Sequence, residues 1–324
     1  MLDPSAVALL IAHSAFFITG SMENIFILLV NFLDWLKSRK LGPCDQIINC
    51  LGFFNLFFQG TVVINEFCIR LWTGYFQDFV VKIFVSIQIF LFFSSLWSCT
   101  FLCFYYCVKI IHFSSSFFFL LKANISKIVP WFLTLFVLVS VGFSLPAFWE
   151  LYKDFSPVPG NFSGNVSSSL NYIFKSKCNC LFRIYLCLSS AAFTIFTLLA
   201  VTILISLCRH MQRVSKNSDG FDARRLAAHI SATRTVTLLL VLYISFYIAL
   251  NFIFSSPAAV GTLLFSLSML MISSFPSLNA LILITGNTKL KNVLKKIFLA
   301  TTETDTSELH NTECNAGGIT SSAG

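Results

Sequence analysis

Two carboxylates lie inside long apolar segments of this sequence, and they are the first candidates for chemistry. Glu23 falls near the middle of residues 7–33, a segment with no other charged residue, and Glu66 falls near the end of a second apolar segment. An ionisable side chain within a membrane span is costly and marks a functional position by default. Glu66 can bind an amine-bearing ligand as an unpaired carboxylate, or it can pair with a cation such as Arg70.

Glu23 also has two interpretations. It can make polar contacts with Asn24, Asn55 and Asn279 inside a helix bundle, or it can contact a ligand directly. We favour the structural role.

No motif typical of an enzyme or a metal centre is visible. The sequence has no Ser-His-Asp or metal-ligand spacing and no glycine-rich phosphate loop, so we expect no enzymatic activity, cofactor or metal. Of the eleven cysteines we place only Cys68, Cys178 and Cys180 in an oxidising space, and a link from Cys68 to one of the other two is left open.

The composition is typical of a membrane protein. Hydrophobic residues make up 56% of the 324 residues and charged residues 11%, against about 25% in soluble domains. The clearest segment, residues 235–288, holds 54 residues without Asp, Glu, Lys or Arg, which is enough for two spans of roughly 20 residues. We predict an all-α membrane protein, a seven-transmembrane helix bundle occupying residues 1–299 as one domain. The expected spans cover residues 7–33, 46–68, 83–111, 128–149, 183–208, 230–255 and 260–286.

The cations predict the orientation of these spans. Of the 22 Lys and Arg residues, 16 fall on one side, which the positive-inside rule assigns to the cytoplasm. The N-terminus is then extracellular and the C-terminus cytoplasmic. Two sequons, at Asn161 and Asn165, fall in an outer loop where glycosylation can occur. The net charge of +8 therefore indicates topology, and we expect no nucleic acid partner.

A short amphipathic helix is expected after the last span, at residues 289–298. Leu290, Val293, Leu294, Ile297 and Phe298 share one face, and lysines including Lys289 surround it. Such a helix lies in the headgroup layer with its lysines toward anionic lipid. The polar segment 300–324 is expected to be a disordered cytoplasmic tail.

A series of short motifs resembles one family along most of the chain. They lie mainly at the cytoplasmic halves of the spans and occur in the family's order. The motifs are Asn24–Lys37, Asp45–Ile47, Leu102–Ser114, Phe119–Lys122, Leu204–His210, His229–Ala232, Leu242–Tyr243 and Gly286–Lys291. Together they resemble the type 2 taste receptors, the bitter receptors, which are G-protein-coupled receptors. The resemblance implies a chemosensory receptor of the plasma membrane that binds small bitter agonists on its extracellular side.

The resemblance also implies a ligand site. Its lining would be Gln88, Phe92 and Ser95 in the third span, Phe246 and Tyr247 in the sixth, and Met269 in the seventh, with Glu66 where many bitter receptors have a Trp. Simple helix packing is the alternative for each aromatic residue. The chain departs from the family in having Asn55 in place of a usual Arg, and Asn279-Ala280 in place of a usual His-Ser.

At the cytoplasmic face, the resemblance implies coupling to a heterotrimeric G protein of the gustducin/inhibitory class. The candidate coupling residues are Tyr105, Tyr106, Lys109, Arg209, His210, His229 and Arg234. A vomeronasal type 1-like pheromone receptor is the alternative within the same class of protein. A small secondary transporter is a second alternative, although seven spans do not divide into the repeated halves that transporters usually show.

Overall fold

The computed structural model describes residues 4–71, 78–111, 116–155, 172–177, 180–217, 223–255 and 263–299. Seven helices in these ranges are long and apolar enough to cross a membrane, which confirms the predicted fold class. They are α1 (Pro4–Ser38), α2 (Pro43–Leu71), α3 (Asp78–Ile110), α4 (Ser116–Glu150), α5 (Cys180–Asn217), α6 (Ala223–Ser255) and α7 (Leu263–Gly286). Helices suit lipid because each pairs its own backbone polar groups.

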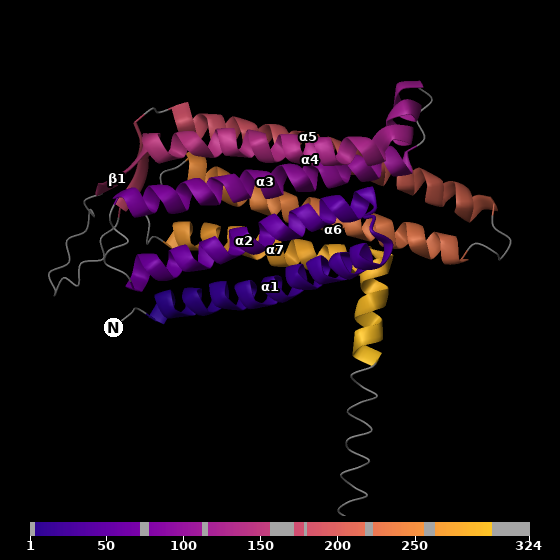
Figure 1. The fold of residues 1–324 in the computed structure, drawn as a ribbon, viewed down its shortest axis with the longest axis horizontal. Helices are drawn as coiled ribbons and strands as arrows, with labels where there is room; N and C mark the ends of the chain where they lie inside the picture. Colours follow the sequence, from indigo (N-terminus) through magenta and orange to yellow (C-terminus); the bar gives the residue numbers. More distant parts are fainter. Residues whose placement is uncertain are drawn as a thin grey trace, which may run out of the picture.

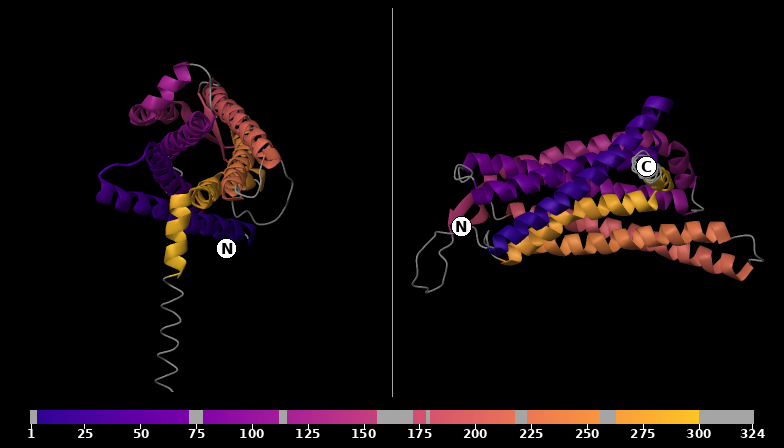
Figure 2. Two further views of the ribbon diagram at one scale, coloured as in Figure 1. Left: turned by 90° about the vertical axis from the view of Figure 1, so that its right-hand side faces the viewer. Right: turned by 90° about the horizontal axis from the view of Figure 1, so that it is seen from below.

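The helices form one elongated bundle (Figures 1 and 2). Helix α1 packs on α2 and α7, α3 packs on α2, α4 and α5, and α6 lies between α5 and α7. The N-terminal end of α1 and the C-terminal end of α7 lie at opposite ends of the bundle, as an odd number of crossings requires (Figure 1). Helices α5 and α6 project past the others at the end where α7 finishes (Figure 1).

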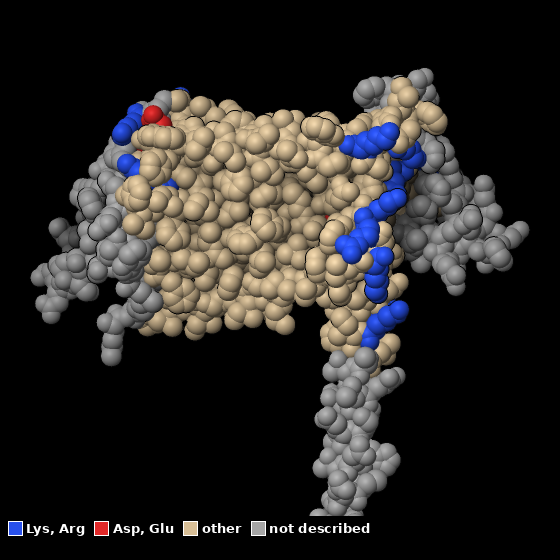
Figure 3. All heavy atoms as spheres, viewed as in Figure 1, with Lys and Arg blue, Asp and Glu red and all other residues tan. Residues whose placement is uncertain are grey.

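The sides of the bundle are apolar. In the face shown in Figure 3, Lys and Arg gather mainly where α7 finishes, and a broad uncharged belt separates them from the opposite end. Large apolar side chains of the spans, such as Met22, Trp131 and Leu138, are more than 60% exposed. An uncharged belt with exposed large hydrophobic residues is the surface expected of a protein solvated by lipid.

A helix at residues 288–299 follows α7 and points away from the bundle (Figures 1 and 2). Its position agrees with the predicted amphipathic helix at residues 289–298. The side-chain oxygen of Asn287 accepts hydrogen bonds from the backbone N–H groups of Lys289 at 3.0 Å and Leu290 at 3.4 Å. Asn287 is therefore the N-cap that separates this helix from α7.

Several helices are longer than the predicted spans. Helix α4 begins at Ser116 rather than near residue 128, α5 continues to Asn217, and α6 begins at Ala223. Hydropathy detects only the part of a helix that lies in lipid, whereas a helix can continue into water with polar residues. The predicted tail, residues 300–324, lies outside the described residues.

A two-stranded hairpin, which was not predicted, connects α4 to α5. Strand β1 (Leu151–Phe155) pairs antiparallel with β2 (Tyr172–Ser176), with Leu151 opposite Ser176. The sequons at Asn161 and Asn165 lie between these strands and outside the described residues. Cys180, at the start of α5, is disulfide-bonded, whereas Cys68 is a free thiol, so the link considered for Cys68 is wrong.

Candidate ligand and coupling sites

Three phenylalanines form a continuous aromatic contact across the bundle. Phe92 of α3 lies 5.7 Å from Phe246 of α6 between ring centroids, and Phe246 stacks on Phe275 of α7 at 4.2 Å. All three are at most 5% exposed. Phe92 also lies 6.3 Å from Phe58 of α2. Displacing one ring therefore disturbs the packing of α3, α6 and α7 together. Phe275 did not stand out in the sequence, because α7 contains several large apolar residues.

Two polar residues predicted to line the ligand site, Gln88 and Ser95, are already hydrogen-bonded to α2. The side-chain amide of Gln88 donates to the carbonyl oxygen of Thr61 at 3.2 Å. The hydroxyl of Ser95 donates to the side-chain oxygen of Asn55 at 2.6 Å, and both residues are buried. These two bonds join α3 to α2. Asn55, which stands where the family usually has Arg, thus holds α3 through a neutral contact.

Tyr247 and Met269 occupy different surroundings from Phe92. The ring of Tyr247 stacks on Phe193 of α5 at 4.1 Å, and its hydroxyl lies 2.7 Å from the hydroxyl of Ser190. Tyr247 therefore ties α6 to α5. Met269 of α7 is half-buried and packs against the core.

The two intramembrane acids have different environments. Glu66 is 4% exposed and has an interaction partner, so its carboxylate is not free. Glu23 is half-buried and accepts a hydrogen bond from the hydroxyl of Ser277 at 2.9 Å. Asn24, its neighbour, is fully buried and donates to the carbonyl oxygens of Gly20 at 2.8 Å and Pro276 at 3.5 Å.

The expected cluster of Glu23 with the interior asparagines is therefore wrong. Adjacent residues on a helix point about 100° apart, so placing Asn24 in the interior turns Glu23 toward the seam between α1 and α7. The sequence alone does not show which of the two faces inward.

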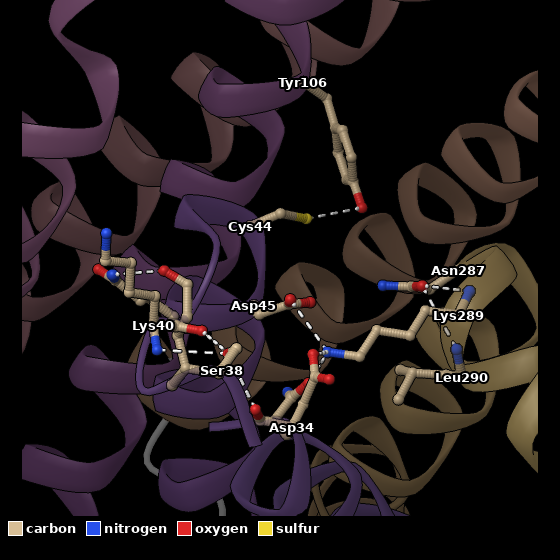
Figure 4. Close-up of polar contacts among 12 residues, drawn as sticks. Asp34, Ser38, Lys40, Cys44, Asp45, Tyr106, Asn287, Lys289 and Leu290 are labelled. Atoms are coloured by element: carbon tan, nitrogen blue, oxygen red, sulfur yellow. Dashed lines mark hydrogen bonds and ion pairs between the residues drawn. The ribbon is translucent and has the colours of Figure 1, made fainter. Parts of the chain in front are cut away.

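At the end of the bundle where α7 finishes, Lys289 joins α1, α2 and the helix at residues 288–299 (Figure 4). Its Nζ lies 2.7 Å from the carboxylate of Asp34 at the end of α1 and 3.1 Å from that of Asp45 at the start of α2. It also donates to the side-chain oxygen of Asn31 at 3.1 Å. We call these four residues the Lys289 clamp.

The clamp corrects the expectation that Lys289 faces anionic lipid. Partial burial lowers the pKa of Lys289, but its hydrogen bonds to Asp34 and Asp45 outweigh this and raise the pKa above its usual value. A raised lysine pKa stabilises the fold below the usual lysine pKa, and this contribution is lost only as the pH rises through the higher value. One sequence signal could have found the clamp: two acids stand on the side where cations are favoured.

The predicted coupling residues divide into two groups. Tyr105 and Tyr106 are in ring contact, the Tyr106 hydroxyl accepts a hydrogen bond from the Cys44 thiol at 3.5 Å, and Lys109 lies 5.6 Å from the centre of the Tyr105 ring (Figure 4 shows the Cys44 contact). These three residues are held by packing at the end of α3. Arg209 of α5 and Arg234 of α6 are exposed. The side chains of His210 and His229 lie outside what the structure describes.

Seven membrane-crossing helices followed by a capped eighth helix are the architecture of G-protein-coupled receptors. A family model described as "Taste receptor protein (TAS2R)" matches residues 1–302, and this chain belongs to that family. Members of the family are receptors rather than enzymes.

Similar proteins cover most of the chain. It is 30% identical to taste receptor type 2 member 40 of Gallus gallus over 285 residues, covering 86% of this chain and 90% of that protein. It is 31% identical to member 2 of Homo sapiens over 300 residues, covering 90% and 96%. It is 32% identical to member 4 of Gorilla gorilla gorilla over 295 residues, covering 86% and 92%.

Proposed function

We propose that this protein binds small bitter compounds between the outer halves of its helices and then activates a heterotrimeric G protein. The observation that carries the proposal is the contact from Phe92 through Phe246 to Phe275 in a chain of the taste receptor family. Ligand pockets in helix bundles are mostly apolar with a few polar anchors. The other lining residues in the proposal are Glu66, Gln88, Ser95, Tyr247 and Met269.

The aromatic contact supports a mechanism for switching. An agonist that inserts beside Phe92 and Phe246 repacks the interface between α3 and α6, and rigid-body shifts of helices are a common response to such changes. The agonist must bind the active arrangement more tightly than the resting one. A shift of α6 then changes the position of its projecting end beside α5.

The charge distribution supports an extracellular N-terminus and a cytoplasmic helix 288–299. Lys and Arg gather at the end where this helix begins (Figure 3), as the positive-inside rule requires for a cytoplasmic face. Disulfides form in oxidising compartments, and the disulfide-bonded Cys180 lies at the opposite end, at the start of α5. Glycosylation at Asn161 and Asn165 belongs to this proposal.

In this orientation the projecting ends of α5 and α6 are the surface for the G protein. Arg209 and Arg234 are exposed on α5 and α6 close to the base of these projecting ends, and they are our candidates for direct contact. Family membership favours a G protein of the gustducin/inhibitory class, and the exposed Ile297 and Phe298 favour contact of the final helix with lipid.

The test is agonist-evoked calcium release in transfected cells that carry a chimeric G protein, using a panel of plant alkaloids and steroids. Once an agonist is found, we expect Phe92→Ala and Phe246→Ala to lower its potency by about tenfold or more, because each removes a buried ring. Phe252→Ala is the matched control, since Phe252 lies on α6 but is 45% exposed. A receptor at the cell surface that carries substrate flux and evokes no G-protein response would contradict the proposal.

A further inference from the structure

The seam between α1 and α7 places an acid at the lipid-facing surface. Glu23 lies near the middle of the span Val7–Ser38 and is half-buried. Its neighbours Ile18, Met22 and Ile25 are 58%, 68% and 43% exposed, which places this side of α1 against lipid. A carboxylate at this depth is costly without a partner that neutralises it.

The structure supplies hydroxyl groups at this seam. Ser277 of α7 is 5% exposed and donates to Glu23, and the hydroxyl of Thr19 lies 3.3 Å from that of Ser277. Within the described ranges no Lys, Arg or His forms an ion pair with Glu23. Lys37, the first cation after Glu23 in the sequence, lies 14 residues further on, which is about 21 Å along a helix.

The wall beside the acid is apolar on the α7 side as well. Met271, Leu278 and Leu281 are 42%, 38% and 46% exposed, so an apolar body beside Glu23 can lie against side chains of both helices. An occupant of this seam therefore needs one cationic or donor group and an otherwise apolar surface.

We propose that the α1–α7 seam is a second ligand site, which takes a lipid-soluble amine whose ammonium group pairs with Glu23. Charge complementarity selects this occupant: a second copy of the chain would bring a second Glu23 of like charge. A phospholipid headgroup stays at the interface and does not reach the middle of the bilayer. The amine approaches through the membrane and shares no residue with the aromatic contact around Phe92.

Binding at this seam has a route to signalling. The hydroxyl of Ser277 ties Glu23 to α7, one of the helices joined by the aromatic contact. An amine that pairs with Glu23 competes for the carboxylate oxygen that Ser277 uses, and so changes the packing of α1 on α7. This signalling consequence rests on the proposed receptor function, whereas binding at the seam does not.

The experiment uses the full chain in lipid nanodiscs and two photoreactive probes of the same shape. One is a 4-alkylpiperidine bearing a diazirine, and the other is the neutral 4-alkyltetrahydropyran. On the unchanged protein we expect the piperidine to label peptides of α1 and α7 around Glu23 and Ser277 at least about tenfold more than the neutral probe, because only the amine gains a charge-assisted bond.

Variants assign the labelling to the seam. Glu23→Gln should abolish the preference for the piperidine, and Glu150→Gln should leave it intact because Glu150 lies elsewhere, at the end of α4. Equal labelling of the unchanged protein by the two probes overturns the proposal, and this comparison needs no variant to fold. Disulfide cross-linking of two copies through Met22→Cys, a position that is 68% exposed at this seam, would also overturn the proposal by assigning the seam to a second copy. Labelling without calcium release would leave the site standing and count against the receptor function alone.

Discussion

The Nζ atom of Lys289 lies 2.7 Å from the Oδ2 atom of Asp34, so the first turn of the last described helix is tied to the end of α1. With Asp45 and Asn31, this lysine fixes three chain segments that are far apart in the sequence. Asn287, two residues before Lys289, is the N-cap of the helix at residues 288–299. The direction of helix 288–299 is therefore set by a cap and a clamp together.

Replacing Lys289 tests the clamp. We expect Lys289→Met to lower the melting temperature of the detergent-purified receptor by a few degrees, because Asp34 and Asp45 lose the cation that bridges them. Lys291→Met is the matched control, since Lys291 is exposed on the same helix and takes no part in the clamp. Equal melting temperatures for the two variants, measured by intrinsic fluorescence, would show that the clamp contributes no stability.

The close approach of α1 and α2 at Gly20 predicts a cost for any side chain there. A Cβ atom at Gly20 would collide with the side-chain amide of Gln59, whose nitrogen donates to the carbonyl oxygens of Phe16 and Ser273. The added methyl group of Gly20→Ala must push the Gln59 amide away from these two carbonyl oxygens, and we expect the loss of the two hydrogen bonds of this buried side chain to cost about 1–3 kcal/mol of stability.

Gly142 offers the control for Gly20. It lies within α4, and a Cβ atom there meets nothing within 4 Å, so Gly142→Ala should be neutral or slightly stabilising. Thermal unfolding of the two variants side by side measures the difference. A Gly20→Ala protein as stable as Gly142→Ala would mean that the Gln59 side chain moves aside without a loss of stability.

The bond between Ser95 and Asn55 predicts non-additive effects. Ser95→Ala should cost about 1–3 kcal/mol, because it leaves the Asn55 side-chain oxygen buried without its donor. Replacing Asn55 by Leu as well removes the orphaned amide, so the double variant should be more stable than the sum of the single changes implies. The check is a double-mutant cycle of melting temperatures, and strict additivity would show that the two side chains are not coupled.

Glu66 gives a prediction about ligand charge. We expect Glu66→Gln to weaken cationic agonists by about tenfold and to leave neutral agonists unchanged, because only cations lose a charge-assisted contact. Concentration–response curves for calcium release measure the two effects. Equal shifts for both kinds of agonist would assign Glu66 to a structural pair within the bundle, in keeping with its burial and its existing partner.

The sequence predicted the ligand site only in part. The motif resemblance picked out Phe92 and Phe246, and the structure places their rings in contact. It also grouped Ser95 and Tyr247 with them, whereas the first bonds Asn55 of α2 and the second bonds Ser190 of α5. Sequence position identifies which part of the span a residue occupies, but the neighbouring helix decides whether its polar group is already used.

The sequence by itself determined the seven spans, the apolar belt and the last amphipathic helix. These depend on apolar transfer into lipid, which is summed along a single segment. Tertiary structure decided that Asn24 faces the interior and Glu23 the seam, and that Lys289 binds Asp34 rather than lipid. A helix that is apolar on every side carries no periodic signal for its own rotation, so only packing against the other helices can choose which residue faces inward.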